Sequence, residues 1–440
     1  MEDDSENQAA RIHVAIADPG REDNYLDIFE YLEENRILSS ISTYSSNTRR
    51  SRPDILLASD EWCSEYSVKI LEAKRNGIPV LHIVDGIVKW GNVWENPRSQ
   101  NEAAGMPMFQ PILADKIACI GSSQARLFCS WGQASKVAVT GLPRFDRYAR
   151  IFNDINTTSP SKTPCTNLKR TILVIVANKP GYVESQVALA RKSLDDLNST
   201  LSQINILNKY CIIWRYGPRS PEVLPSSLHG SVENTGTLFD ALAKADFVIS
   251  SPSTATLEAM SMDIPTCIID YLNKPEFIQA AWSIRSNNEM REVIESLLNS
   301  EENRMTYQRY LLHDQMRLDG LATPRVFALM QKMISISKAS LMKGLKPDYS
   351  KIDTDPFCYS SLVPYSYHPE FLFPAHSLFV RSDTDELKAE LGHLRLRVQQ
   401  LENQITSLKW HVHNKSVFAR SRRKASMIVH RLRSFLKQRR

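Results

Sequence analysis

The sequence predicts an α/β protein of two domains, each built on an open parallel β-sheet, followed by a helical extension. Short apolar runs alternate with segments of helical periodicity in residues 11–150 and again in residues 170–337. This is the pattern of strands buried on both faces and connected by helices. A polar stretch over residues 151–169 separates the two regions and is predicted to be a linker. Apolar residues then recur by fours and threes from 387 to 412, which is typical of a coiled coil.

Composition limits the classes of protein to consider. The chain has 440 residues and 42% hydrophobic residues, enough for two cores. Its seven cysteines are scattered singly without a Cys-x-x-Cys pair, which favours a reducing compartment over a disulfide framework or a structural zinc site. The acidic amino-terminus lacks a signal-peptide core, and no apolar run approaches the ~20 residues of a membrane-spanning helix. We therefore expect a cytoplasmic protein.

The basic charge is concentrated at the carboxyl terminus. The net charge is +5, from 54 Lys and Arg against 49 Asp and Glu, and residues 415–440 hold ten basic and no acidic residues. Without that segment, 44 basic residues face 49 acidic ones. The body of the protein therefore lacks the overall positive charge of a nucleic-acid-binding protein, and no nucleic-acid partner is expected.

In the first domain, the apolar runs predict strands and the stretches between them predict helices. The expected strands are 12–17, 54–58, 79–84, 116–120 and 136–139, and the expected helices are 25–36, 64–76 and 122–131. Parallel sheets of this type bind ligands beyond the carboxyl ends of their strands. The residues that follow the strands are therefore the site candidates.

Asp18 and Gly20 follow the first strand, in an Asp-Pro-Gly-Arg turn. Gly20 permits close approach of the backbone to a ligand. We list both residues as acceptor-site candidates. The alternative is a polar turn without a ligand.

Asp85, Gly86 and Lys89 follow the strand at 79–84. Asp85 follows a largely apolar run and is placed to act as a general base on a hydroxyl. Gly86 would leave space, and Lys89 would be able to pair with a phosphate. The long loop that follows contains Trp90 and further aromatic residues, which favours a loop that packs over a ligand such as a sugar ring. The alternative is that Asp85 only caps the next element.

The last strand of the first domain is followed by Gly-Leu-Pro-Arg-Phe-Asp over residues 141–146. Arg144 carries a fork-shaped guanidinium suited to anions. Asp146 either orients Arg144 or forms a structural pair with it in an interdomain hinge.

In the second domain, strands are expected at 171–177 and 210–214, with helices at 183–202, 238–243 and over much of 289–333. Arg215 directly follows the second of these strands, and its guanidinium could neutralise a diphosphate. The alternative is an exposed basic loop.

Residues 246–270 predict a strand, a loop, a helix and a second strand. The helix is expected to begin at Ser253 or Thr254, and its free N–H groups would suit a diphosphate. Thr256 follows within the first turn, and the carboxylate of Glu258, about one turn along, could accept hydrogen bonds from a ribose. The alternative is an ordinary βαβ unit whose glutamate is solvated or caps a helix.

These features resemble a GT-B glycosyltransferase of bacterial surface polysaccharide biosynthesis, related to the CDP-glycerol glycerophosphotransferase-like group. The resemblance covers roughly residues 11–335 and rests on the Gly-x-Pro-Arg-x-Asp segment at 141–146 and on Ser253-Thr254 with Glu258. In that group a tryptophan–histidine–glycine segment followed by a lysine ends a first-domain strand, whereas Asp85-Gly86 stands here with Lys89 downstream. The fold it implies is two Rossmann-like domains.

The resemblance also implies roles for the candidate residues. The second domain would bind a nucleotide-activated donor, with the helix start at Ser253 and Thr254 on the phosphates and Glu258 on the ribose. The first domain would bind the acceptor, with Asp85 as the base. An aspartate in place of histidine favours inverting sugar transfer over polyol-phosphate transfer.

The implied mechanism is a direct displacement that needs no metal or cofactor. The departing diphosphate would be stabilised by the helix start together with Arg215 or Arg144. Two Asp-x-Asp segments, at 353–355 and 383–385, lie outside the predicted sheets and are not expected to bind a metal.

The extension is predicted to contain a linker at 338–381, a coiled coil at 382–413 and a basic amphipathic tail at 414–440. We expect the seam at 387–412 to form a homo-oligomer and residues 415–440 to bind the anionic inner face of the cell membrane, near a lipid-linked or polysaccharide acceptor. The alternatives are a helix packed on its own domain and a solvated tail or nucleic-acid contact.

Three alternatives to a glycosyltransferase remain open at this point. They are a polyol-phosphate transferase on the same fold, a sugar-nucleotide epimerase, and a non-catalytic membrane scaffold.

Overall fold

The computed structural model describes residues 11–45, 52–89, 91–95, 108–149, 169–203, 209–272, 278–352 and Ile405 of the 440-residue chain. The chain divides into two compact units, Met1–Leu372 and Phe373–Arg440, and the elements below belong to the first. Trp90, residues 151–168 of the first predicted linker, residues 353–381 of the second predicted linker, and the predicted coiled coil and tail apart from Ile405 lie outside the described residues. Residues 338–352, predicted as a linker, contain the end of α10 (Ala322–Met342) and a short 3₁₀ helix.

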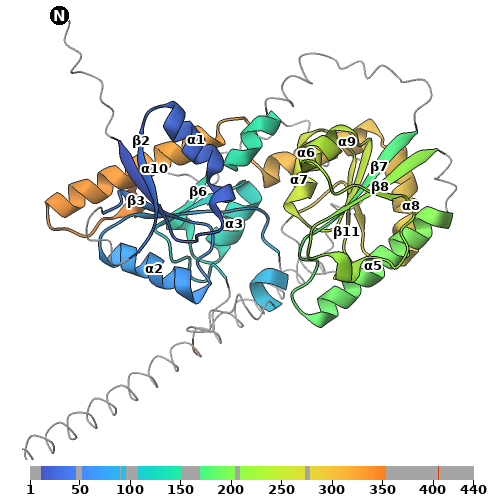
Figure 1. Ribbon diagram of the computed structural model, residues 1–440, viewed down its shortest axis with the longest axis horizontal. Coiled ribbons are helices and arrows are strands. Elements are labelled where there is room, and N and C mark those ends of the chain that lie inside the picture. The colour runs from blue at the N-terminus through green and yellow to red at the C-terminus, as the bar shows by residue number, and fades with distance from the viewer. Residues whose placement is uncertain are drawn as a thin grey trace, which may run out of the picture. The chain divides into compact units, whose positions relative to one another are not determined.

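The first domain is a parallel sheet of six strands in the order β2-β1-β3-β4-β5-β6 (Figure 1). Its strands are β1 (Ile12–Ile16), β2 (Leu38–Thr43), β3 (Ile55–Ala58), β4 (Val80–Ile83), β5 (Lys116–Cys119) and β6 (Val137–Val139). Its helices are η1 (Glu22–Asn24), α1 (Leu26–Glu34), α2 (Ser64–Arg75), η2 (Gly91–Glu95), α3 (Ser122–Ser130), η3 (Ala134–Lys136) and η4 (Pro143–Phe145).

The second domain is also a parallel sheet of six strands, in the order β12-β11-β10-β7-β8-β9. Its strands are β7 (Arg170–Val176), β8 (Tyr210–Tyr216), β9 (Ser231–Val232), β10 (Phe247–Ser250), β11 (Thr266–Ile269) and β12 (Trp282–Ile284). Its helices are α5 (Glu184–Gln203), η5 (Pro221–Val223), α6 (Leu238–Ala243), α7 (Thr254–Ser261), α8 (Asn287–Leu298) and α9 (Glu302–Gln315). The last two helices, α10 (Ala322–Met342) and η6 (Tyr349–Lys351), pack in the core of the first domain. Two six-stranded parallel α/β domains confirm the two-domain part of the predicted fold class, whereas the predicted coiled coil and basic tail stay a prediction.

Helices cover both faces of each sheet, which is why the central strands are apolar throughout. Strand β1 shows the alternation: Val14 and Ile16 pack with α1 and α10, whereas Ala15 packs with the core under α2 and α3. In the second sheet, α5 and α8 pack on one face, and α6 and α7 on the other. Every strand therefore ends at a rim where side chains leave the core.

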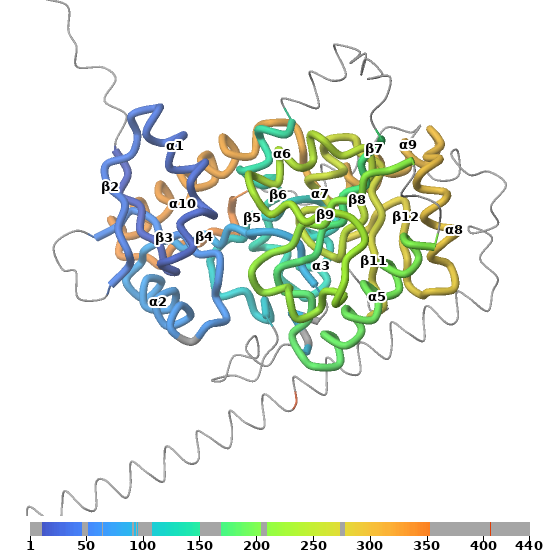
Figure 2. The backbone as a smooth tube through the Cα atoms, turned by 45° about the vertical axis from the view of Figure 1, so that its right-hand side comes forward, coloured from blue at the N-terminus to red at the C-terminus, as the bar shows by residue number. Residues whose placement is uncertain are grey.

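Helix α10 returns to the first domain and lies beside α1 (Figure 2). Val326, Met330 and Met333 are fully buried in the same core as Val14. The carboxylate of Asp146 accepts hydrogen bonds from Ala322 N and Thr323 N, both at 2.9 Å, which satisfies two free N–H groups at the start of the helix. The sequence placed residues up to 337 in the second domain and did not predict this packing.

Some elements differ from the expectation for identifiable reasons. The stretch 289–333, predicted as helical, contains three helices separated by turns. Strand β2 was not predicted because it is an edge strand whose residues are mostly exposed and polar. Strands β9 and β12 are two and three residues long, too short to give a period. Within the described ranges, no helix combines the length and the apolarity needed to cross a bilayer.

Candidate functional site

A cavity of about 580 Å³ lies between the strand-end loops of the two domains. Its volume falls in the range of small-molecule sites, about 300–1,000 Å³. The polar residues that line it are Arg21, Asp60, Asp85, Lys89, Asn92, Asn178, Lys179, Tyr182, Ser253 and Thr254. Three cationic and two anionic side chains contribute to this lining, which favours an anionic ligand.

Asp85, which the sequence analysis proposed as the general base, belongs to the first-domain wall of the cavity. Its side chain is 45% exposed, and Asp85 Oδ2 lies 3.7 Å from Arg21 Nη1. Arg21 is held in turn by Asp60, whose Oδ2 lies 2.7 Å from Arg21 Nη2. Burial raises the pKa of Asp60 above its ordinary value, while Arg21 acts in the opposite direction. Arg21 thus links a buried carboxylate to the exposed carboxylate of Asp85.

Gly86 is needed for a close approach between the domains, and not for the space around Asp85 that the sequence suggested. A Cβ atom at this position would lie 2.2 Å from Thr254 Oγ1. The next residue, Ile87, donates its N–H to Thr254 Oγ1 at 3.3 Å, and Gln124 donates to the carbonyl of Gly86 at 3.1 Å. The first-domain backbone therefore lies directly against the start of α7.

Ser253 and Thr254 line the cavity from the second domain, together with residues that follow β7. Ser253 is the extended N-cap residue of α7, with φ −160° and ψ 164°, and its side chain makes no capping hydrogen bond. Ser253 Oγ instead lies 3.3 Å from Ser250 Oγ. The helix start predicted to bind phosphate thus lines the cavity.

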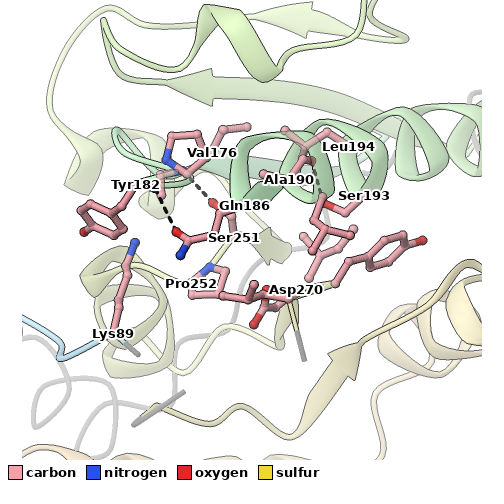
Figure 3. Close-up of a pocket in the computed structure, with 16 residues that line it drawn as sticks. Lys89, Val176, Tyr182, Gln186, Ala190, Ser193, Leu194, Ser251, Pro252 and Asp270 are labelled. Atoms are coloured by element: carbon pink, nitrogen blue, oxygen red, sulfur yellow. Dashed lines mark hydrogen bonds between the residues drawn. The ribbon is translucent and has the colours of Figure 1, made fainter. Parts of the chain in front are cut away.

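Lys89 lines this cavity and also a smaller side pocket of about 40 Å³ (Figure 3). Ala177 and Tyr182 line both spaces as well. The side pocket extends from the cavity between α5 and the carboxyl ends of β7, β10 and β11.

Asp18 and Gly20, by contrast, do not line either space. Asp18 is fully buried, and its carboxylate accepts hydrogen bonds from Tyr25 OH at 2.6 Å, Ser59 Oγ at 2.6 Å and Ser59 N at 3.0 Å. Gly20 has φ +87°, a left-handed conformation that favours glycine, and is exposed. The turn at residues 18–21 positions Arg21 instead of contacting a ligand itself.

Arg144 does not line the cavity, and Asp146 does not pair with it. The guanidinium of Arg144 lies 5.7 Å from the centre of the Phe145 ring, and its Nε atom is buried without a hydrogen-bond partner among the described residues. Asp146 caps α10, as described above. The segment 141–146 therefore joins α10 to the first domain.

Arg215 is engaged by the backbone of its own domain. Its guanidinium donates to the carbonyls of Glu233 at 3.1 Å, Thr235 at 2.9 Å and Gly236 at 2.6 Å. These bonds direct the guanidinium towards its own domain, and Arg215 lines neither space.

Thr256 and Glu258 face inwards from α7. Thr256 is fully buried, and its hydroxyl has no partner among the described residues. Glu258 is 9% exposed, and its Oε2 accepts a hydrogen bond from the hydroxyl of Tyr148 in the first domain. Burial, followed by the charge of Glu258, raises the pKa of Tyr148 above its ordinary range. Glu258, which the sequence predicted to bind a ribose, thus forms a hydrogen bond between the two domains in this structure.

Several lining residues were missed by the sequence analysis although a signal existed. Asp60 follows β3, and Asn178 and Lys179 follow β7, so the same rule applied to these two strand ends would have found them. The close approach of Gly217 to Asn178 could not be read from the sequence: a Cβ atom at Gly217 would lie 2.5 Å from Asn178 Oδ1.

Comparisons with known proteins give only distant likenesses. No family model matches the chain, and no curated protein matches it. Among solved structures, the UDP-GlcNAc 2-epimerase from Neisseria meningitidis bound to UDP-GlcNAc is similar with a TM-score of 0.49 and 12% identity, covering 73% of this chain and 100% of that chain. The UDP-GlcNAc 2-epimerase of Methanocaldococcus jannaschii is similar with a TM-score of 0.49 and 11% identity, covering 73% of this chain and 99% of that chain. A variant of the wall teichoic acid polymerase TagF with CDPG is similar with a TM-score of 0.45 and 12% identity, covering 73% of this chain and 88% of that chain. At these scores the likenesses assign no activity to this chain.

Proposed function

We propose that the protein is a glycosyltransferase that moves a sugar from a nucleoside-diphosphate donor to a hydroxyl of a cell-surface polysaccharide or lipid-linked glycan. The observation that carries the proposal is the cavity, which is lined both by Asp85 and by Ser253 and Thr254 at the start of α7. A base and a phosphate-binding helix start are the two parts that a direct displacement requires.

In this mechanism Asp85 removes the proton from the acceptor hydroxyl while the oxygen attacks the anomeric carbon. The bond to the diphosphate breaks, and its electrons leave with the nucleoside diphosphate. The N–H groups at the start of α7, together with Lys89 and Lys179, stabilise the developing charge. Arg144 and Arg215 have no part in this version, because neither lines the cavity.

The acceptor is proposed to lie at the inner membrane face, to which the basic segment 415–440 would bind, and the seam at 387–412 is proposed to join copies of the chain. Both proposals rest on the sequence pattern.

The test is a thermal-shift screen of the full chain against nucleoside diphosphates, their sugars and CDP-glycerol. Stabilisation by one nucleotide sugar, lost in Thr254→Tyr, which would obstruct the start of α7, supports the proposal. Stabilisation by CDP-glycerol alone would indicate a polyol-phosphate transferase instead. A folded protein that responds to no nucleotide would favour the non-catalytic scaffold.

A further inference from the structure

The side pocket beside Lys89 has a surface unlike that of the main cavity. Its walls are mainly apolar, with Val176, Leu189, Ala190, Leu194 and Ile269 among them. Its volume of about 40 Å³ is small beside the 580 Å³ of the main cavity, so the pocket suits one substituent of a ligand and not a whole sugar ring.

Most polar side chains in its wall already have partners within the protein. Gln186 accepts from Tyr182 N at 2.9 Å, Ser193 donates to the carbonyl of Ala190 at 2.8 Å, and Ser251 accepts from Ala177 N at 2.6 Å. These bonds leave the interior with little capacity to hydrate a bound group, so it favours an apolar one.

Two charged residues complete the pocket. Asp270 follows β11, and its Oδ1 accepts from Leu272 N at 3.0 Å. Lys89 lies at the end shared with the main cavity, beside Tyr182, while Ser193 and Leu194 lie at the far end (Figure 3). The pocket thus combines a carboxylate acceptor and an ammonium donor with an apolar interior.

We infer that this side pocket binds the N-acyl group of an N-acylamino sugar, an inference that rests on the proposed function. The acyl methyl lies among Val176, Ala190 and Leu194. The amide N–H donates to Asp270, and the amide carbonyl accepts from Lys89. A hydroxyl in place of the amide would leave the apolar interior unfilled.

The pocket's position fits this assignment. Ser251 and Pro252 form part of its wall and immediately precede Ser253 at the start of α7. A sugar attached to a diphosphate at that helix start is therefore within reach of the pocket. The same loop would set both the position of the phosphates and the choice of sugar.

The test uses the full chain and the nucleoside diphosphate that binds best in the screen above. Calorimetry would compare two donors on that nucleotide, one with a 2-acetamido sugar and one with the corresponding 2-hydroxy sugar. Burying one methyl group and gaining a hydrogen bond are together worth roughly tenfold in affinity. We expect the wild-type protein to prefer the acetamido donor by that factor.

Ala190→Leu fills the pocket and should abolish the preference while the affinity for the free nucleoside diphosphate is kept. Ala188→Leu is the matched control, because Ala188 lies exposed on the same helix and does not line the pocket. If Ala190→Leu prevents folding, Ala190→Val replaces it as the variant that fills the pocket. The melting temperature of each variant without ligand shows whether it is folded.

Equal affinity of the wild-type protein for the two donors, or a preference that survives Ala190→Leu, would overturn the inference and leave the proposed function standing. The absence of binding to any nucleoside diphosphate would overturn both.

Discussion

Asp18 and Asp85 are the same residue type at the same edge of the first sheet, yet their surroundings differ completely. Asp18, after β1, is fully buried and accepts three hydrogen bonds from Tyr25 and Ser59. Asp85, after β4, is 45% exposed and faces the cavity. The comparison teaches that a strand end places a carboxylate at the rim, and that its neighbours decide whether it is enclosed by the fold or left open to a cavity.

The largest expected effect comes from Asp85→Asn. If Asp85 is the general base, the transfer rate with the donor identified by the screen should fall by roughly 10²–10⁴-fold. The free energy of unfolding should change by no more than about 0.5 kcal/mol, because the side chain is half exposed. Steady-state kinetics and urea unfolding would measure the two quantities.

Asp23→Asn is the control for Asp85→Asn, since Asp23 is an exposed aspartate in η1 that does not line the cavity. A rate within the wild-type range for Asp85→Asn would remove Asp85 from the mechanism.

Asp18→Asn should give the opposite pattern. The amide keeps the size of the side chain but replaces one acceptor oxygen by a donor that faces other donors. Hydrogen bonds to a charged group are worth about 1.5–3 kcal/mol, and the free energy of unfolding should fall by about that amount. The rate per folded molecule should stay close to wild type. A stable variant with a large loss of rate would instead place Asp18 in the reaction.

Gly86→Ala tests the contact between the two walls of the cavity. The new methyl would overlap Thr254 Oγ1 at 2.2 Å, and overpacking of this kind costs about 1–3 kcal/mol. Thr254→Ala removes that oxygen, so the cost of Gly86→Ala should be smaller in the Thr254→Ala background. A double-mutant cycle by chemical unfolding measures the difference. Additive effects would mean that the two residues do not meet in solution.

The outcome for α7 shows how far the sequence can predict a site. The strand–loop–helix pattern located the helix start, and Ser253 and Thr254 at that start line the cavity. Helical spacing also places Thr256 and Glu258 within one turn, but it does not say which partner from the first domain meets them. Tyr148 is 110 residues from Glu258 in the sequence, and no local pattern links the two.

The arginine residues show the same limit of prediction from sequence. Arg144 and Arg215 follow strands, as Arg21 does, and all three have the chemistry of an anion binder. Arg215 is used by three carbonyl groups of a distant loop, whereas Arg21 reaches the cavity through a turn that contains a left-handed glycine. Strand ends can be predicted from local periodicity, but the partners of a long side chain depend on tertiary contacts.

The smallest expected effect concerns the pair Tyr148 and Glu258, which resembles Tyr25 and Asp18 in that a tyrosine hydroxyl donates to a buried carboxylate. Burial and then Glu258 raise the pKa of Tyr148 above its ordinary value. The folded protein therefore keeps the phenol proton at a pH where the unfolded chain loses it. This contribution to stability is complete below about pH 10 and is lost as the pH rises towards the folded-state pKa.

Tyr148→Phe should remove the part of the loss of stability at alkaline pH that comes from Tyr148. The lost hydrogen bond to Glu258 should also change the free energy of unfolding by a constant amount at every pH. The change in slope is at most about 1.4 kcal/mol per pH unit for one proton, measured by urea unfolding at a series of pH values between neutral and alkaline. Some slope should remain, because burial also raises the pKa of Tyr25. Glu258→Gln should weaken the dependence without removing it, since burial is the larger cause. A slope unchanged in Tyr148→Phe would show that this tyrosine is not buried against Glu258 in solution, and Glu258 would then be available, like Asp85, to a ligand.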